Sequence, residues 1–64
     1  MEQIKVLRTK AGLTREKLAQ MAGVNAQTIY RVERGESERI SSIEKIAAAL
    51  GYEVEITLRP AGAN

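Results

Sequence analysis

Amide and guanidinium side chains gather in one short stretch of the sequence, from Val24 to Gly35. The stretch has the signals of a helix, because Asn25 can cap its start and Gly35 can end it in a left-handed conformation. One face of this helix carries Ala26, Gln27, Tyr30, Arg31 and Arg34. Amide and guanidinium groups hydrogen-bond to the edges of base pairs in the major groove, so this face suits double-stranded DNA.

The opposite face of the same helix is predicted to point inward. Ile29, Val32 and Glu33 recur at spacings of three and four residues, which places them on one side of a helix. The two apolar residues are therefore expected to anchor the helix while its polar face stays in solvent.

Two helices are predicted before this stretch. The first is expected over Glu2–Ala11, and its apolar stripe consists of Ile4, Leu7 and Ala11. Arg8 lies beside that stripe, so its stem should be partly covered. The second helix follows Thr14, a good N-cap, and ends at Gly23. Its residues predicted to face the core are Leu18, Met21 and Ala22. So short a connection to the helix after Asn25 predicts a steep crossing, as in a helix-turn-helix.

A fourth helix is predicted after the polar loop that runs from Gly35 to Ile40. Ser41 and Glu44 have the spacing of a capping box, so the helix is expected to begin at Ser41. Its apolar positions are Ile43, Ile46, Ala47 and Leu50. Gly51 is placed to close it.

The period of the sequence changes after Gly51. Apolar residues alternate strictly with polar ones, at Tyr52, Val54, Ile56 and Leu58. This alternation predicts a β-strand that Pro60 stops, with a fifth helix as the alternative. Because every other segment reads as helix, the strand is expected to pair with the same strand of a second copy about a two-fold axis.

Length and composition limit the possible classes of protein. The chain has 64 residues, no Cys and no His, so neither a disulfide nor an ordinary zinc site is expected, and no cofactor is predicted.

Residues 1–35 carry seven Lys and Arg against three Glu, a net charge of +4, whereas residues 36–64 carry three against five, a net charge of −2. A basic front fits a surface that faces phosphates. No membrane span or leader is apparent, so a soluble cytoplasmic protein is expected.

The order and spacing of these residues resemble the Cro/C1-type helix-turn-helix family, the XRE family of bacterial and phage regulators. The resemblance covers Leu7–Gly51 and rests on Leu18, Ala19, Gly23, Ile29, Glu33 and Gly35. It implies a mainly α, four-helix lambda-repressor-like domain. The strand, in place of the usual fifth helix, is similar to that of HipB- and HigA-type antitoxins, in which it pairs between subunits. The expected division is a DNA-binding domain over 1–51, a dimerisation strand over 52–60 and a disordered tail over 61–64.

The resemblance also implies roles for single residues. The residues expected at base edges are Ala26, Gln27, Tyr30 and Arg31, with the glutamine suited to adenine and the arginine to guanine. A phosphate is the alternative contact for Tyr30. The residues expected at phosphates are Arg15, Thr28, Arg34 and Arg39. Arg15 stands where the family usually has a glutamine. Many members pair an arginine of the first helix with the glutamate that ends the third, which implies a structural ion pair between Arg8 and Glu33.

The function implied is that of a sequence-specific DNA-binding transcriptional regulator, a dimeric repressor on a pseudo-palindromic operator. An autoregulating antitoxin with a toxin partner is a further interpretation. The alternatives are a stand-alone or phage-type repressor and a protein-interaction module that no longer binds DNA. An enzyme is not expected, since the chain has no His, Cys or Asp and no glycine-rich phosphate loop.

Overall fold

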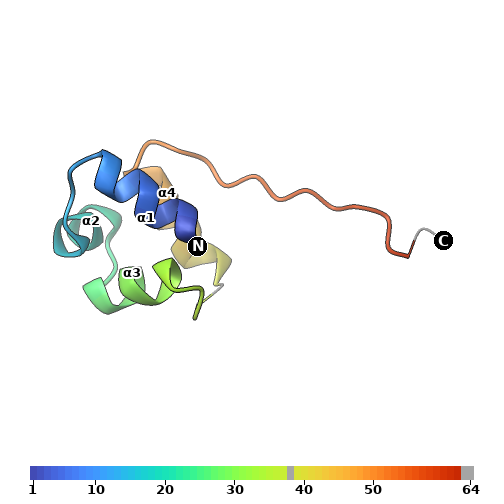
Figure 1. The fold of residues 1–64 in the computed structure, drawn as a ribbon, viewed down its shortest axis with the longest axis horizontal. Coiled ribbons are helices and arrows are strands. Elements are labelled where there is room, and N and C mark those ends of the chain that lie inside the picture. The colour runs from blue at the N-terminus through green and yellow to red at the C-terminus, as the bar shows by residue number, and fades with distance from the viewer. Residues whose placement is uncertain (38, 63–64) are drawn as a thin grey trace.

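Four helices form the body of the protein in the computed structural model, which describes residues 1–37 and 39–62. They are α1 (Glu2–Lys10), α2 (Arg15–Ala22), α3 (Ala26–Glu33) and α4 (Ile40–Ala49). α2 packs against both α3 and α4, and α1 packs against α3 (Figure 1). The prediction of a mainly α, four-helix domain is confirmed for the described residues.

An aliphatic core joins these helices. The largest side chains without exposed surface are Leu18 of α2, Ile29 and Val32 of α3, and Ile46 of α4. Ile4 brings α1 into the same cluster and is 3% exposed. Full burial of one such side chain stabilises the fold by about 1.5–3 kcal/mol, so this small cluster is the main source of stability for the domain.

Two residues predicted to be in the core lie outside it. Met21 is 49% exposed, because Leu18, Ala19 and Ala22 form the buried face of α2. At about 100° per residue, a face centred on those three leaves Met21 at its rim. Ala11 is also exposed, because α1 ends at Lys10 and Ala11 is its C-cap.

The turn between α2 and α3 is fixed by local hydrogen bonds. Asn25 Oδ1 accepts the backbone N–H of Thr28 at 2.9 Å, so the predicted N-cap of α3 is present. Thr14 caps α2 in the same way, through the N–H of Lys17 at 3.0 Å. Gly23 ends α2 in the left-handed region, at φ 75°, where a residue with a side chain would cost about 1–2 kcal/mol. These signals keep the connection between the two helices as short as predicted.

The start of α4 differs from the prediction. The helix begins at Ile40, its N-cap is Arg39, and no side chain caps it, so the Ser41–Glu44 capping box is wrong. The backbone explains the difference, because the N–H of Ile43 already bonds to the carbonyl of Arg39. Ser41 therefore lies inside the first turn and cannot act as the cap.

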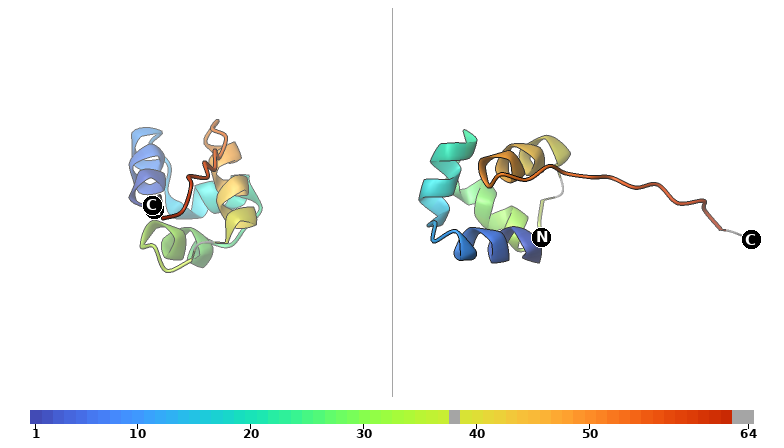
Figure 2. Two further views of the ribbon diagram at one scale, coloured as in Figure 1. Left: turned by 90° about the vertical axis from the view of Figure 1, so that its right-hand side faces the viewer. Right: turned by 90° about the horizontal axis from the view of Figure 1, so that it is seen from above.

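The chain after α4 forms an extended arm, defined as residues 52–62, and none of the described chain is a strand. The predicted strand is thus missing, since ladder hydrogen bonds need a second strand and the rest of this chain supplies helices and loops. Figure 2 shows the arm leaving the body between α1 and α4. The predicted disordered tail begins in this arm, but residues 63–64 lie outside the described chain.

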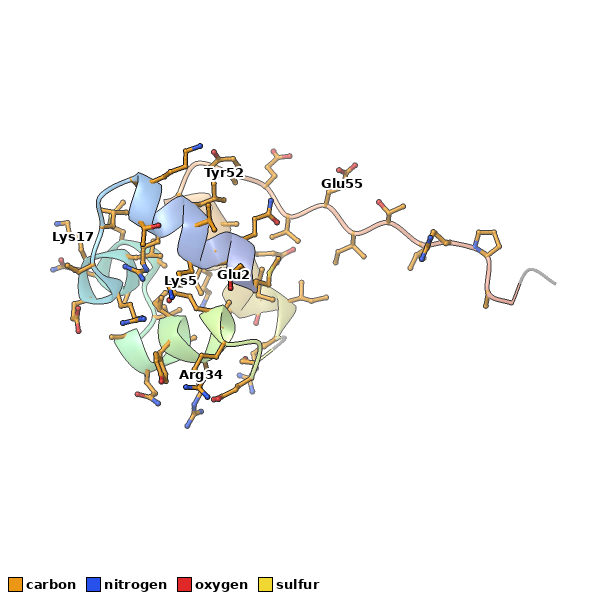
Figure 3. The ribbon with its side chains drawn as sticks, in the orientation of Figure 1. Glu2, Lys5, Lys17, Arg34, Tyr52 and Glu55 are labelled. Atoms are coloured by element: carbon orange, nitrogen blue, oxygen red, sulfur yellow. The ribbon has the colours of Figure 1, made fainter. Side chains whose placement is uncertain are left out.

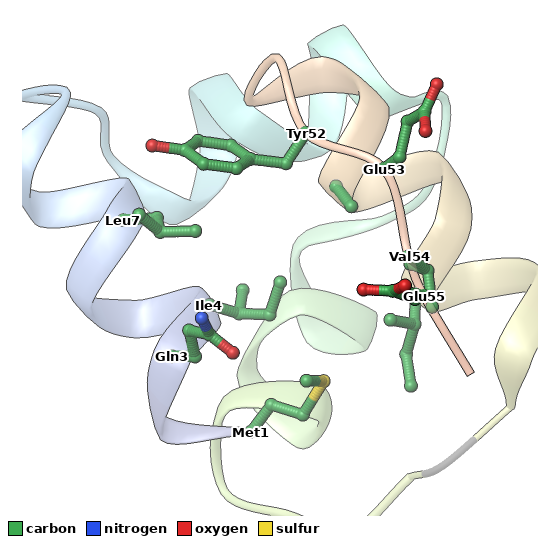
Figure 4. Close-up of a pocket in the computed structure, with 10 residues that line it drawn as sticks. Met1, Gln3, Ile4, Leu7, Tyr52, Glu53, Val54 and Glu55 are labelled. Carbon is green, nitrogen blue, oxygen red and sulfur yellow. The ribbon is translucent and has the colours of Figure 1, made fainter. Parts of the chain in front are cut away.

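The first residues of the arm cover a groove between α1 and α4. The groove has a volume of about 330 Å³, and its floor includes Ile4, Leu7, Ile43 and Ala47. The side chains of Tyr52 and Val54 lie over this floor (Figure 4). Further along, Ile56 and Leu58 are 59% and 90% exposed. The arm is therefore anchored at its base and leaves its later apolar residues uncovered.

The burial pattern on α2 predicts the cost of two truncations on one helix. Leu18→Ala should lower the free energy of unfolding by about 2–5 kcal/mol, because it removes a fully buried side chain and leaves a cavity. Met21→Ala, the matched control at an exposed site, should change it by less than about 1 kcal/mol. Urea denaturation followed by circular dichroism measures both. Equal losses would contradict the placement of Met21 at the rim.

Candidate nucleic-acid interface

The polar face of α3 offers unengaged hydrogen-bonding groups. Gln27 and Arg31 are both exposed. Neither side chain makes a hydrogen bond to any other described residue, so both keep their donors and acceptors for an external partner. Ile29 and Val32, on the buried side of the same helix, are 0% exposed and hold it against the core. The residues expected to read bases therefore project from a fixed support.

The first turn of α3 is less open than the sequence suggests. Ala26 is half-buried and packs against the core, so it can offer only part of its methyl group to a partner. Thr28 is also half-buried, and its hydroxyl lies 3.1 Å from Asn25 Oδ1. The hydroxyl donates in that contact and can still accept, while a phosphate contact needs donors. Any phosphate contact from this turn would come mainly from backbone N–H groups.

A buried carboxylate joins the first three helices. Glu33 of α3 has a side chain only 2% exposed, and its Oε2 lies 2.5 Å from Nε of Arg8 in α1. Its Oε1 accepts from Nη2 of Arg8 at 3.4 Å and from Nε of Arg15 in α2 at 3.1 Å. Nη1 of Arg8 also donates to the carbonyl of Leu13, at 2.8 Å, in the loop between α1 and α2. The pair implied by the resemblance is thus part of a larger cluster.

Arg15 stands at the start of α2, where a phosphate contact was expected, but one of its donors is already engaged. Nε of Arg15 bonds to Glu33, and the Arg15 side chain remains 39% exposed. The guanidinium carbon also lies 5.2 Å from the centre of the Tyr30 ring. The sequence did not predict either contact, because they join residues from different helices.

Arg34 projects from the end of α3 beside the same tyrosine. Nη1 of Arg34 donates to the hydroxyl of Tyr30 at 2.7 Å, and Nε pairs with Glu36 at 2.8 Å. The hydrogen bond to Tyr30 and the nearby charge of Glu36 raise the pKa of the Arg34 guanidinium above its ordinary value. This group therefore keeps its positive charge. The spacing of four residues between Tyr30 and Arg34 is a signal from which the contact could have been predicted.

Lys5 of α1 is a further cation close to Arg15 and Arg34. Figure 3 shows Lys5 on α1 and, in the same view, the side chain of Arg34, the C-cap of α3, below that helix. Together with Arg15, these two residues line a hollow of about 430 Å³ that also includes Glu2, Tyr30 and Glu33. Arg39, the N-cap of α4, is exposed and lies outside that hollow.

Two short helices joined by a tight turn, with the second exposing a polar face, define the helix-turn-helix class of DNA-binding proteins. A model of the helix-turn-helix family matches residues 4–56, most of the chain. The protein belongs to this family, the XRE-type helix-turn-helix proteins, whose members are DNA-binding transcriptional regulators. No curated protein matches the chain. Within residues 1–37 and 39–62, no helix is long and apolar enough to cross a membrane.

The two carboxylates bonded to arginines make a matched pair of tests. Glu33→Gln should lower the free energy of unfolding by about 3–5 kcal/mol, because it leaves the buried Arg8 guanidinium without a counter-charge. Glu36→Gln removes an exposed partner, from an ion pair whose side chains are 55% and 49% exposed, and should cost less than about 1 kcal/mol. Urea denaturation measures both variants. A loss for Glu33→Gln as small as that for Glu36→Gln would show that the buried cluster does not hold the helices together.

Proposed function

We propose that this protein is a dimeric, sequence-specific repressor that reads double-stranded DNA with α3. The observation that carries the proposal is the contrast between the two faces of this helix. Ile29 and Val32 are fully buried, while Gln27 and Arg31 are exposed and make no hydrogen bond in the described chain. A rigid helix with free amide and guanidinium groups matches what major-groove recognition requires.

Each side chain of this face suits a particular contact. Gln27 can bond an adenine through its amide, and Arg31 can bond the two acceptors of a guanine. Ala26 contributes at most an apolar contact with a thymine methyl group. Each good bidentate contact discriminates between bases by about 1–3 kcal/mol, so these two residues would carry most of the direct readout.

Phosphate contacts would fix the position of α3 in the groove. Arg15, Arg34 and Arg39 are the side chains that we assign to this role, with the N–H groups at the start of α3 beside Thr28. Contacts of this kind carry no sequence information but set the register of the protein on the duplex. The net charge of +4 on residues 1–35 favours approach of this side to DNA.

The arm supplies a reason to expect two copies. Ile56 and Leu58 are exposed and alternate with polar residues, and the extended backbone of residues 53–59 forms no β-ladder with the described residues. Pairing of two arms about a two-fold axis would cover the exposed apolar side chains and supply the ladder hydrogen bonds. The residues that would pair are Tyr52, Val54, Ile56 and Leu58. Such a dimer would place two α3 helices on half-sites about 34–36 Å apart, on a pseudo-palindromic operator. It would act in the cytoplasm by blocking access to a promoter.

A narrower role as the antitoxin of a toxin–antitoxin operon is supported only by the resemblance of the arm to that of HipB- and HigA-type proteins. A gene for a kinase-like or ribonuclease-like toxin beside the gene for this chain would support that role. Its absence would favour a stand-alone or phage-type repressor. The salt dependence of affinity for DNA distinguishes a repressor from a module that has lost DNA binding, because true DNA binding weakens steeply as the salt concentration rises.

Selection of binding sites from random DNA tests the readout. Arg31→Ala should lower affinity for the selected operator by about 1–3 kcal/mol and relax the preference at one base pair in each half-site. Arg39→Ala is the matched control, because it also removes one exposed arginine but should weaken all sequences alike. If the consensus for Arg31→Ala equals that of the unaltered protein, Arg31 does not read a base.

Charge substitutions in the arm test the dimer. Ile56→Glu combined with Leu58→Glu should convert a dimer into a monomer, because the two new carboxylates would meet their copies across the two-fold axis. Thr57→Glu adds a charge on the opposite face of the arm and should leave the dimer in place. Light scattering measures the mass of each variant. A double variant that stays dimeric would rule out pairing through this face.

A further inference from the structure

Tyr30 contacts two arginines that come from different parts of the chain. The guanidinium carbons of Arg15 and Arg34 each lie 5.2 Å from the centre of its ring, within the range of a cation–π interaction. The Tyr30 hydroxyl also accepts a hydrogen bond from Nη1 of Arg34 at 2.7 Å. Tyr30 itself is 37% exposed, so its ring lies at the surface beside the two cations.

Each of these two arginines also contacts a carboxylate. Glu33 accepts from Nε of Arg15 at 3.1 Å, and Glu36 pairs with Nε of Arg34 at 2.8 Å. Each guanidinium is therefore held at its Nε edge and beside the tyrosine ring. Arg15 makes no other hydrogen bond within the described chain, so both of its terminal nitrogens keep their donors, and Nη2 of Arg34 keeps its own.

The two guanidiniums therefore have a defined spacing. Since both lie 5.2 Å from one ring centre, their carbons are at most twice that distance apart, about 10 Å. They border the hollow described above, which Lys5 also lines. Glu2, Glu33 and Glu36, the partner of Arg34, lower the positive charge around this hollow, although Glu33 is already shared with Arg8. A singly charged phosphodiester suits such a modest excess of positive charge better than a polyphosphate does.

We propose that Arg15 and Arg34 form a preorganised site for the phosphodiester groups of one DNA strand, with Tyr30 as the positioning residue that orients both. This assignment rests on the proposed function and replaces the base-reading role expected for Tyr30. A long cationic side chain normally loses rotamer freedom when it binds a phosphate. Here the ring and the carboxylates have already restricted both side chains, so less freedom is lost on contact with DNA.

Substitution of Tyr30 separates positioning from base reading. Tyr30→Leu removes the ring and the hydroxyl, and it should lower affinity about fivefold or more for every DNA sequence alike, because both cation–π contacts are lost. The consensus from site selection should stay the same, and affinity should depend less steeply on salt concentration. Tyr30→Phe keeps the ring and should lose less affinity. Met21→Ala, a truncation at an exposed site outside both the proposed DNA contacts and the arm, is the control for folding and should leave the selected consensus and the salt dependence unchanged. A changed consensus for Tyr30→Leu, or an unchanged affinity, would overturn the assignment.

A measurement without DNA tests the preorganisation directly. Nitrogen relaxation of the arginine Nε–H groups in the free protein should show Arg15 and Arg34 ordered and Arg31 and Arg39 mobile. In Tyr30→Leu, Arg34 should become as mobile as Arg39. If Arg15 and Arg34 are already as mobile as Arg39 in the unaltered protein, the positioning role of Tyr30 is wrong even if DNA binds. If the unaltered protein binds no DNA at low salt, the proposed function fails, and DNA phosphate fails with it as the ligand.

Discussion

The buried carboxylate of Glu33 is the interaction on which the arrangement of the first three helices depends. It accepts hydrogen bonds from Arg8 of α1 and Arg15 of α2, while its own helix, α3, carries the polar face. Removal of a carboxylate from water is costly, and the cost is offset only when its oxygens are fully bonded. Both oxygens of Glu33 are bonded, and no buried side-chain polar atom in the described chain lacks a partner. The cluster therefore favours one orientation of α3 over others that an aliphatic core would also permit.

The same cluster connects the core of the domain to its surface. Arg8 is 7% exposed and belongs to the interior, whereas the Arg15 side chain is 39% exposed and extends from Glu33 towards solvent. Tyr30 then lies against both Arg15 and Arg34. A continuous series of contacts thus runs from the buried end of α3 to the cations at its edge. A glutamine at position 15 would carry no charge to pair with Glu33 and no cation to place against the Tyr30 ring. Both contacts therefore depend on the arginine at this position.

The interactions that hold the arm differ from those that hold the helical body. The body is held by a core within one chain, and α3 contacts each of the other three helices. The arm is anchored only at its base, where Tyr52 and Val54 cover the groove between α1 and α4. Beyond that point its apolar residues are exposed, and a β-strand needs hydrogen bonds from a neighbouring strand. Alternation of residues along the arm describes how it could pair, but a single chain supplies no partner.

The sequence by itself determined the four helices, most of their boundaries and the buried face of α3. These features depend on local rules, namely the helical period, the caps at Thr14 and Asn25, and the glycine that ends α2. The family followed from the same local order of residues. The tertiary structure alone decided that Arg15 bonds to Glu33, that Tyr30 lies against two arginines, and that Met21 lies at the rim of the core. The tertiary structure also decided the start of α4, which begins at Ile40 rather than at the predicted Ser41, because the N–H of Ile43 bonds to the carbonyl of Arg39. Contacts between helices depend on how the core orients each helix, and that orientation is a property of the whole packed domain rather than of any short stretch of sequence.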